Sequence, residues 1–446
     1  ASDVYKRQDH IHSLGMKAGL YTDAGNSTCG SMWDNDTAGI GAGIYGHEPQ
    51  DAQLYFGDWG FDFIKIDYCG GDALGLNEKE RYTSIRNSID KVNKDVSINI
   101  CRWAFPGTWA KDAATSWRIS GDINAHWGSL RYVVGKNLYL SAYAGNGHYN
   151  DMDMMVIGFR NDSKVGGQGL TPTEEEAHFG LWCIMSSPLL IGCNLENMPD
   201  SSLKLLTNKE LIALNQDPLG LQAYVAQHEN EGYVLVKDIE QKRGNVRAVA
   251  LYNPSDTICS FSVPFSSLEF GGNVKVRDLV KHSDLGNFSG TFEQTLPAHS
   301  AMFLRIEGET RLEPTLYEAE WAYLPLFNDL GKNPKGIIYA HDKEASGKMK
   351  VGFLGGQPEN YAEWREVYSE NGGRYDMTIH YLYGKGRQIE LDVNGIITKI
   401  DSLGKDNGHN QITVPVELKA GYNTIRMGNS YNWAPDIDCF TLTKAL

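Results

Sequence analysis

An apolar segment, residues 61–71 (FDFIKIDYCGG), carries two charged side chains close to its end. Its hydrophobic residues predict a buried β-strand, which Lys65 and Asp67 interrupt where the strand should stop. Burying a carboxylate is costly unless another group pairs with it. In one interpretation Asp67 only caps the next helix. In the other, Asp67 is catalytic, because the C-terminal ends of barrel strands carry active-site residues.

A second strand end favours the catalytic interpretation. Residues 116–122 (SWRISGD) deliver Arg118 and Asp122 at the end of another expected strand. Two carboxylates from two strand ends are the minimum needed for hydrolysis of a glycosidic bond. Lys65 lies two residues before Asp67 and therefore on the same side of the pleat, where a cation would favour the ionised acid. The alternative is that Lys65 and Arg118 form ordinary ion pairs.

The elements that must position these side chains follow a regular order from residue 9 to residue 217. Strands are expected at 16–25, 61–69, 96–103, 116–122, 149–158 and 186–195, and helices at 50–59, 78–93, 130–136 and 173–185. This alternation predicts a parallel sheet with helical crossovers. Six strand units fit either an open doubly wound sheet or a (β/α)8 TIM barrel whose first two strands are missing. We expect the partial barrel, because the chain begins inside a helix, after residues 1–8, which look like a non-native scar.

The rest of the chain has an all-β pattern. Short alternating strands between residues 218 and 307 predict an antiparallel β-sandwich, followed by a charged linker at 307–314. Residues 314–446 predict a second, jelly-roll-like β-sandwich module. The chain therefore divides into a catalytic barrel and two β domains.

Composition narrows the function further. The 446 residues carry a net charge of −15, which argues against binding to nucleic acid. The apolar runs are too short for a membrane span. The seven cysteines include no CxxC pair, so a zinc site is not expected. No pattern in the sequence predicts an oligomeric state.

Six motifs resemble those of a known family. They are GLYTDAGNSTC (19–29), FIKIDYC (63–69), WRISGD (117–122), YNDMDMMVIG (149–158), IMSSPLLIG (184–192) and LIALNQDPLG (211–220). With them, residues 9–305 resemble glycoside hydrolase family 27, the α-galactosidases and α-N-acetylgalactosaminidases. The resemblance implies a barrel followed by an antiparallel β domain, a retaining mechanism, no cofactor for catalysis, and an oligo- or polysaccharide substrate.

The same resemblance assigns roles to single residues. It implies that Asp67 is the nucleophile and that Asp122 is the general acid/base, which must begin protonated. The implied sugar-pocket residues are Tyr21, Lys65, Arg118 and Asp153. It further implies a disulfide between Cys29 and Cys69, which needs an oxidising compartment, so we expect a secreted or periplasmic protein. For Asp151, on the same face as Asp153, we expect a structural role.

One motif departs from the family pattern. Many α-galactosidases have Cys-Glu-Trp after the fifth strand, and that Glu helps to recognise the 2-position of the sugar. This chain has Cys101-Arg102-Trp103, and an Arg cannot accept hydrogen bonds. We assign Arg102 and Trp103 to the substrate pocket, and Trp109 is a further candidate for stacking on sugar faces, although a single Trp is more often part of a core.

The last block resembles a family 6/35-type carbohydrate-binding module, on the segments YEAEWA (317–322) and NSYNWAPDIDCF (429–440). The resemblance implies a structural calcium near Glu318, Glu320 and Asp438. It also implies sugar contacts from Trp433, Asn432 and Tyr361. The alternative for Glu318 and Glu320 is that they are solvent-facing acids on an edge strand.

Three functional hypotheses follow. The first is a retaining exo-glycosidase that removes terminal α-D-galactosyl residues. The second is a related activity in the same fold: β-L-arabinopyranosidase, α-N-acetylgalactosaminidase or isomaltodextranase. The third is a catalytically inactive fragment that only binds carbohydrate.

Overall fold

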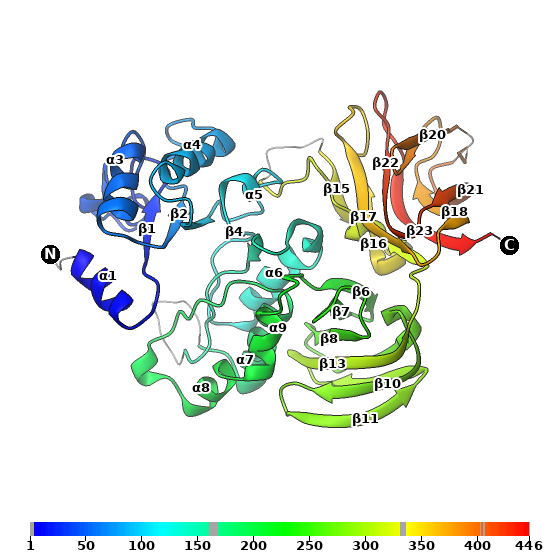
Figure 1. The fold of residues 1–446 in the computed structure, drawn as a ribbon, viewed down its shortest axis with the longest axis horizontal. Helices are drawn as coiled ribbons and strands as arrows, with labels where there is room; N and C mark the ends of the chain where they lie inside the picture. Colours follow the sequence, from blue (N-terminus) through cyan, green and yellow to red (C-terminus); the bar gives the residue numbers. More distant parts are fainter. Residues whose placement is uncertain (1–3, 160–167, 331–335, 402, 405, 446) are drawn as a thin grey trace. The chain divides into compact units, whose positions relative to one another are not determined.

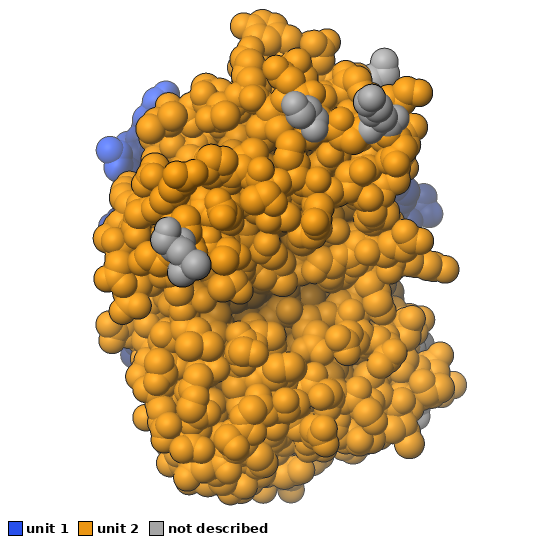
Figure 2. Space-filling view, turned by 90° about the vertical axis from the view of Figure 1, so that its right-hand side faces the viewer, with its two compact units in different colours: residues 1–122, 147–151, 328–330 blue, residues 123–146, 152–327, 331–446 orange. Residues whose placement is uncertain are grey.

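The computed structural model describes residues 4–159, 168–330, 336–401, 403–404 and 406–445. The chain divides into two compact units, coloured blue and orange in Figure 2. Unit 1 comprises residues 1–122, 147–151 and 328–330, and unit 2 comprises residues 123–146, 152–327 and 331–446. None of the helices in the described residues is long and apolar enough to cross a membrane.

Unit 1 is built on a five-stranded parallel sheet whose strands lie in chain order. The strands are β1 (Gly19–Asp23), β2 (Phe63–Asp67), β3 (Ser97–Ile100), β4 (Ser116–Arg118) and β5 (Tyr149–Asp151) (Figure 1). Ile64 and Ile66 of β2 are fully buried, as the apolar pattern predicts. The strand of residues 61–69 is thus confirmed, although it is shorter than the run of hydrophobic residues.

Helices follow the strands of unit 1. They are α1 (Val4–Ser13), α2 (Cys29–Trp33), η1 (Thr37–Gly39), α3 (Glu48–Ala52), the π-helix η2 (Gln53–Asp58), α4 (Glu78–Asp90) and α5 (Ala110–Ala113). The single helix expected at 50–59 is instead α3 followed by η2. Helix α1 includes residues 4–8 and buries Gln8, so the segment interpreted as a scar shares a helix with the residues after it. Its non-native origin stays a prediction.

Unit 2 begins with the helices that come next in the chain. They are α6 (Trp127–Asn137), η3 (Ser141–Tyr143), α7 (Pro172–Ile184), η4 (Leu195–Asn197), α8 (Asp200–Leu206) and α9 (Lys209–Asn215). Thr171 and Glu174 form a capping box that fixes the start of α7. The sixth strand expected at 186–195 is not a regular strand, because only one parallel bridge forms there, between Met155 and Ile191.

The antiparallel domain of unit 2 has a six-stranded sheet, ordered β11-β10-β13-β8-β7-β6, and a two-stranded sheet, β12-β9. Its elements are β6 (Tyr224–Glu229), β7 (Gly232–Asp238), β8 (Val246–Asn253), β9 (Cys259–Pro264), η5 (Phe265–Leu268), β10 (Phe270–Asp278), β11 (Ser283–Ser289), β12 (Thr291–Leu296) and β13 (Ser300–Arg311). Aliphatic and aromatic side chains of both sheets form one core. The linker expected at 307–314 is mostly strand, since β13 continues to Arg311, whose guanidinium lies 2.8 Å from Asp238.

The C-terminal module is also a two-sheet β structure. One sheet runs β15-β16-β23-β18-β21 with β14 added at β23, and the other runs β17-β22-β19-β20. The elements are β14 (Leu316–Glu318), η6 (Ala319–Trp321), β15 (Ile338–His341), η7 (Ser346–Lys348), β16 (Met349–Gly352), β17 (Tyr361–Ser369), β18 (Gly373–Leu382), β19 (Ile389–Val393), β20 (Ile396–Ile400), β21 (Asn410–Leu418), β22 (Gly421–Gly428) and β23 (Asp436–Lys444). The predicted second all-β block is therefore a β-sandwich.

One short segment of this last block belongs to unit 1. Residues 328–330 are grouped with the parallel sheet rather than with the module that follows them in the chain. The backbone N–H of Asp329 donates to the carbonyl of Phe105 at 2.9 Å. A Cβ at Gly107 would lie 3.5 Å from Cβ of Asn328. The segment thus contacts the loop that follows β3, which carries Trp103.

Candidate active site

Strand register brings four polar side chains together at the ends of β1 and β2. Tyr21 pairs with Lys65, and two positions further along Asp23 pairs with Asp67. Side chains two residues apart on a strand point to the same face of the sheet. The expectation that Lys65 lies beside Asp67 is met, because Nζ of Lys65 is 3.2 Å from Oδ1 of Asp67.

Asp67 is buried, and both of its oxygens have a partner. Oδ1 pairs with Lys65, and Oδ2 accepts a hydrogen bond from the Tyr21 hydroxyl at 3.1 Å. Burial lowers the pKa of Lys65, but the Asp67 carboxylate outweighs that effect, and the pKa lies above its ordinary value. Burial, helped by the Asp67 and Asp23 carboxylates, raises the pKa of Tyr21 so far that the phenol keeps its proton. The site therefore holds a cation and a donor against the carboxylate.

Asp122 lines the same cavity as Asp67. This cavity has a volume of 370 Å³ and is lined by Cys29, Trp33, Asp67, Trp103 and Asp122. Arg118, which is almost fully buried at the end of β4, donates from Nη2 to Oδ1 of Asp122 at 3.0 Å. The side chain of Asp122 is 70% exposed, whereas that of Asp67 is 8% exposed. The two acids thus face one cavity from different environments.

Two tryptophans complete the wall of the cavity. Trp103 was expected there, and its backbone has φ of +57°, a conformation that is uncommon for a residue other than Gly. Trp33 was not expected, and it is 74% exposed at the end of α2. Flat aromatic faces beside two carboxylates suit a ligand that combines apolar ring faces with hydroxyl groups. The exposed indole of Trp33 could not have been assigned from a segment without periodicity.

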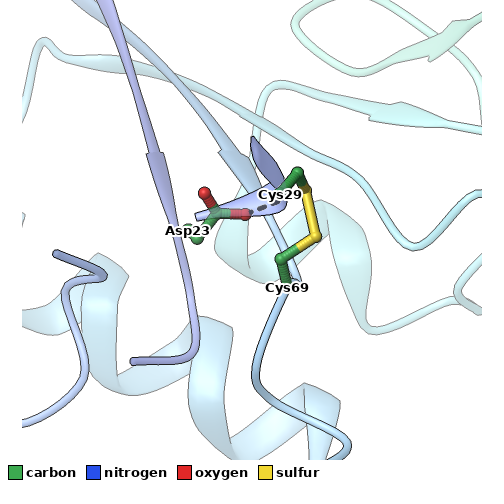
Figure 3. A group of neighbouring side chains, drawn as sticks. All are labelled: Asp23, Cys29 and Cys69. Atoms are coloured by element: carbon green, nitrogen blue, oxygen red, sulfur yellow. Dashed lines mark hydrogen bonds between the residues drawn. A yellow bond between two sulfur atoms is a disulfide. The ribbon is translucent and has the colours of Figure 1, made fainter. Parts of the chain in front are cut away.

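The loops after β1 and β2 are joined by the predicted disulfide between Cys29 and Cys69 (Figure 3). The two Cα atoms are 5.2 Å apart. Sγ of Cys29 lies 3.3 Å from Oδ1 of Asp23, but a disulfide sulfur carries no proton, so this is a contact and not a donated hydrogen bond. At Gly25, where the loops meet, a Cβ would lie 2.2 Å from the carbonyl oxygen of Cys69. The disulfide therefore holds α2 and Trp33 at the cavity.

Asp23 is a functional candidate that the sequence reasoning missed. It is completely buried at the end of β1, directly beside Asp67 in the register. Burial, together with the Asp67 carboxylate, raises the pKa of Asp23 to about 6. The signal was available, because Asp23 ends a strand as Asp67 does, but only Asp67 interrupts a strongly apolar run.

Arg102 is not among the residues that line the cavity, and its place in the substrate pocket stays a prediction. Its guanidinium lies 3.3 Å from Asp72 and 3.1 Å from Glu78, and it stacks over the ring of Tyr68 at 4.3 Å. These contacts fix the loop after β2 to the start of α4. Trp109 is also engaged elsewhere, since its indole N–H donates to Pro106 and its ring stacks on that of Tyr82.

Asp153 holds backbone rather than lying free in a pocket. Its Oδ2 accepts from the N–H of Ile123 at 2.9 Å, and its Oδ1 accepts from the N–H of Met154 at 2.8 Å. Its backbone has φ of +77°. A sugar contact from Asp153 stays a prediction. Asp151 is buried and accepts from Asn99 at 2.8 Å, in keeping with the structural role expected for it.

A second group of acids lies in the C-terminal module, where Glu318, Glu320 and Asp438 are all buried. Oε2 of Glu318 and both carboxylate oxygens of Glu320 have no hydrogen-bond partner among the described residues. Burial raises the pKa of Glu318 to about 7 and that of Asp438 to about 6. Burial and the Glu318 carboxylate raise the pKa of Glu320 well above its ordinary value. The alternative of solvent-facing acids is thereby excluded.

A turn covers these acids closely. The backbone N–H of Ser346 donates to Asp438 at 2.9 Å, and Gly347 follows with φ of +56°. A Cβ at Gly347 would meet Oε1 of Glu320, so a larger residue there would have to displace that carboxylate. Several unpaired carboxylate oxygens under a tight turn are the donor set that a hard dication such as Ca²⁺ prefers.

Aromatic side chains of the C-terminal module line a cavity with a volume of 610 Å³. Its lining includes Phe353, Tyr383, Trp433, Lys350, Arg387 and Asp436. Phe353 and Tyr383 both have positive φ, near +59°, and Trp433 is 41% exposed. Trp433 was expected at a sugar site, whereas Tyr361 lies under Arg426 outside this lining, as does Asn432, whose N–H donates to Asn429. Aromatic residues with uncommon backbone conformations around a cavity make it a candidate binding site.

Comparison with known proteins identifies the first two domains. Residues 1–217 match the family described as Alpha galactosidase A, and residues 232–306 match the Alpha galactosidase C-terminal beta sandwich domain. Alpha-galactosidase 3 of Arabidopsis thaliana is 36% identical over 65% of this chain and 63% of its own length. Alpha-galactosidase A of Cellvibrio japonicus is 33% identical, over 67% of this chain and 74% of its own. The crystal structure of alpha-galactosidase I from Mortierella vinacea superimposes with a TM-score of 0.59 at 26% identity, covering 69% of this chain and 81% of that one.

Proposed function

The chain belongs to the α-galactosidases of glycoside hydrolase family 27, and we propose that it hydrolyses terminal α-D-galactosyl residues with retention of configuration. It spans about 63% of the length of the Arabidopsis relative, so the activity of the whole protein belongs to this proposal. One observation carries it: Asp67, held between Lys65 and Tyr21, lines the same cavity as Asp122.

In the first step, Asp67 attacks the anomeric carbon of the galactosyl residue while Asp122 gives its proton to the glycosidic oxygen. The bond to the leaving group breaks, and an ester forms between the sugar and Asp67. Lys65 and Tyr21 support the ionised nucleophile before attack, from the two oxygens that they contact. Solvent reaches Asp122 because its side chain is largely exposed.

In the second step, the Asp122 carboxylate takes a proton from a water molecule, which attacks the anomeric carbon and releases Asp67. Arg118 holds Asp122 at 3.0 Å and so fixes the direction in which its carboxyl group works. Two inversions return the sugar with its original configuration. No group other than the two carboxylates and water takes part in the proton balance.

Arg102 bears on the choice of sugar. Its guanidinium pairs with Asp72 and Glu78, which supports a position outside the sugar pocket rather than the role of the family's Glu. Trp103, the next residue, lines the cavity instead. An aromatic wall in place of a charged group favours a neutral pyranose without a requirement for a polar contact at that position. β-L-Arabinopyranoside, which lacks only the C6 hydroxymethyl group of galactose, is the second candidate.

The test is a panel of aryl glycosides: α-D-galactoside, α-N-acetylgalactosaminide and β-L-arabinopyranoside. We expect fastest turnover of the α-D-galactoside, with the α-anomer of galactose as the first product in a proton NMR time course. The Asp67→Asn variant prepared in parallel controls for contaminating glycosidases. Faster turnover of the β-L-arabinopyranoside would instead identify the chain as a β-L-arabinopyranosidase. If this chain hydrolyses none of the three substrates, the proposal that it is catalytically active is contradicted.

In the C-terminal module we propose a structural Ca²⁺ held by Glu318, Glu320 and Asp438. The support is the set of buried carboxylate oxygens without partners under the Gly347 turn. Bound there, the ion would neutralise the acids and fix β14 to β23, which already pair between Glu318 and Cys439. Catalysis at Asp67 and Asp122 does not require it.

We also propose that the aromatic cavity of this module binds glycans. Phe353, Tyr383 and Trp433 offer ring faces, and Lys350, Arg387 and Asp436 offer polar groups for sugar hydroxyls. Affinity electrophoresis in galactan- or galactomannan-containing gels tests this. We expect retarded migration of the chain, abolished in Trp433→Ala but kept in Tyr431→Ala, which changes a more exposed ring outside the lining. Equal retardation of both variants would contradict the assignment.

The Cys29–Cys69 disulfide supports a location outside the reducing cytosol, in the periplasm or the extracellular medium. This matches the supply of oligo- and polysaccharides there. A fractionation experiment on the native host, with the thiol state of Cys29 assayed by alkylation, checks it.

A further inference from the structure

The end of β1 places a third carboxyl group, that of Asp23, beside Asp67. Asp23 is completely buried, pairs in the strand register with Asp67, and has one oxygen, Oδ2, without a hydrogen-bond partner among the described residues. Figure 3 shows it beside the disulfide that joins the loops after β1 and β2. Asp23 is not among the residues that line the cavity.

Asp23 and Asp67 share one hydroxyl group. The phenol oxygen of Tyr21 lies 3.2 Å from Oδ1 of Asp23 and 3.1 Å from Oδ2 of Asp67. A phenol has a single proton, so it cannot donate to both carboxylates at once. Only if Asp23 carries a proton of its own can both contacts be hydrogen bonds, with Asp23 donating to the phenol oxygen and the phenol donating to Asp67.

We infer that Asp23 is a positioning residue: in its neutral form it donates to the Tyr21 oxygen and thereby commits the Tyr21 proton to the nucleophile, Asp67. The inference rests on the proposed function, since it needs Asp67 to be the reacting carboxylate. When Asp23 ionises, two anions compete for the phenol proton, and Asp67 loses part of its hydrogen bonding.

The surrounding charges are compatible with a neutral Asp23. On β2, Lys65 pairs with Asp67 and lies over the ring of Tyr21. Its positive charge therefore balances Asp67 rather than Asp23. From α4, Arg81 donates to the carbonyl of Ala24 and pairs with Glu48 of α3. On the α2 side, the disulfide sulfurs do not titrate. No Lys or Arg among the described residues forms an ion pair with Asp23, whereas Asp67 has one.

The experiment compares Asp23→Asn, Asp23→Ala, Tyr21→Phe and the two Tyr21→Phe double variants. The substrate is an aryl α-galactoside with a good leaving group, for which acid assistance from Asp122 matters little. Asn cannot ionise, but its amide can donate to the phenol oxygen. We therefore expect kcat/KM of the wild type to fall as pH rises through about 6, and expect this fall to be absent in Asp23→Asn.

Asp23→Ala should lower kcat by about tenfold below pH 6, where Asp23 of the wild type is neutral, and by less above pH 6, while leaving KM within about twofold. In the Tyr21→Phe background neither Asp23 variant should have a further effect, because the shared hydroxyl is gone. An unchanged pH profile in Asp23→Asn, or an equal loss from Asp23→Ala with and without the Tyr21 hydroxyl, would overturn the inference. Asn is nearly isosteric with Asp, so Asp23→Asn keeps the test available if Asp23→Ala fails to fold.

A second readout does not depend on turnover. Infrared difference spectra across a pH titration should contain the C=O band of a protonated carboxylic acid that disappears in Asp23→Asn. If the chain is silent on every glycoside but the band is present, the proposed function fails and the neutral Asp23 stands. If the chain is active and the band is absent, the proposed function stands and the role of Asp23 fails.

Discussion

Two groups of buried acids in the described part of the chain, one at the end of β2 and one in the C-terminal module, differ in what balances their charge. At the end of β2, Asp67 has the ammonium of Lys65 on one oxygen and the hydroxyl of Tyr21 on the other. In the C-terminal module, Glu318 and Glu320 form no ion pair with Lys or Arg among the described residues and keep several oxygens without partners. A carboxylate that the protein itself neutralises is ready to react, whereas acids left without a counter-charge require protons or a metal ion.

The largest effect should come from the acid with a built-in cation. Asp67→Asn removes the nucleophile but keeps its shape, and we expect kcat to fall at least about a thousandfold. Asp95→Asn, a change of an exposed acid just before β3, is the matched control and should leave kcat unaltered. Substantial residual turnover of the aryl α-galactoside by Asp67→Asn would contradict the role of Asp67 as the nucleophile.

Asp122 tests whether the second catalytic acid acts by proton transfer. Asp122→Asn should slow natural oligosaccharides by about a hundredfold or more, but aryl substrates with good leaving groups much less. The measurement is kcat on a series of aryl glycosides with increasing leaving-group pKa. If kcat depends on the leaving-group pKa equally strongly in the variant and in the wild type, Asp122 is not the general acid.

The buried acids of the C-terminal module should respond to pH and Ca²⁺ together. Raised pKa values of Glu318, near 7, and Asp438, near 6, mean that the folded state holds protons that the unfolded chain has lost. Without Ca²⁺, stability should therefore fall as pH rises from about 4 through 7. With Ca²⁺ at a hundred times its Kd, about 2.7 kcal/mol should return at pH 8.

Thermal unfolding in EGTA and in Ca²⁺ measures this difference. Glu320→Gln should abolish the Ca²⁺-dependent rise in Tm, while Glu417→Gln, which alters an exposed acid of β21, should keep it. If Tm is the same with EGTA and with Ca²⁺ at pH 8, the cluster is not a metal site.

The smallest expected effect concerns Trp33. Its indole lines the cavity from α2 and is largely exposed, so it can stack only on the outer, leaving-group side of a substrate. Trp33→Ala should raise KM for oligosaccharides by about fivefold and leave small aryl substrates almost unchanged. Met32→Ala, which changes the neighbouring exposed side chain, is the control. Equal effects on both substrate classes would contradict an outer position.

The sequence predicted those parts of the fold whose patterns are local. The apolar run of β2 and the alternating strands β7, β8 and β18 signal their structure within a few residues. Strands with polar or short segments were missed, among them β11 (SDLGNFS) and β16 (MKVG). Their pairing depends on neighbours far away in the chain, which a local pattern does not contain.

The site was predicted where one strand carries the whole signal, as with Lys65 and Asp67. Asp23 was missed because its importance arises from the register between β1 and β2, and a single strand does not reveal its register. The ion pairs of Arg102 could not be predicted for a related reason. Its partners Asp72 and Glu78 lie 30 and 24 residues away, so these contacts become visible only in three dimensions.

The segment of residues 328–330 has a consequence for how such proteins can be cut or recombined. By sequence it belongs to the C-terminal block, but its backbone contacts the loop after β3, through Asp329 and Phe105. A protease or a genetic exchange that removes everything after the expected linker therefore also takes away a support of the loop that carries Trp103. The boundary between the structural units therefore differs from the domain boundary that the sequence composition predicts. A truncated chain that keeps the support of this loop has to end after residue 330.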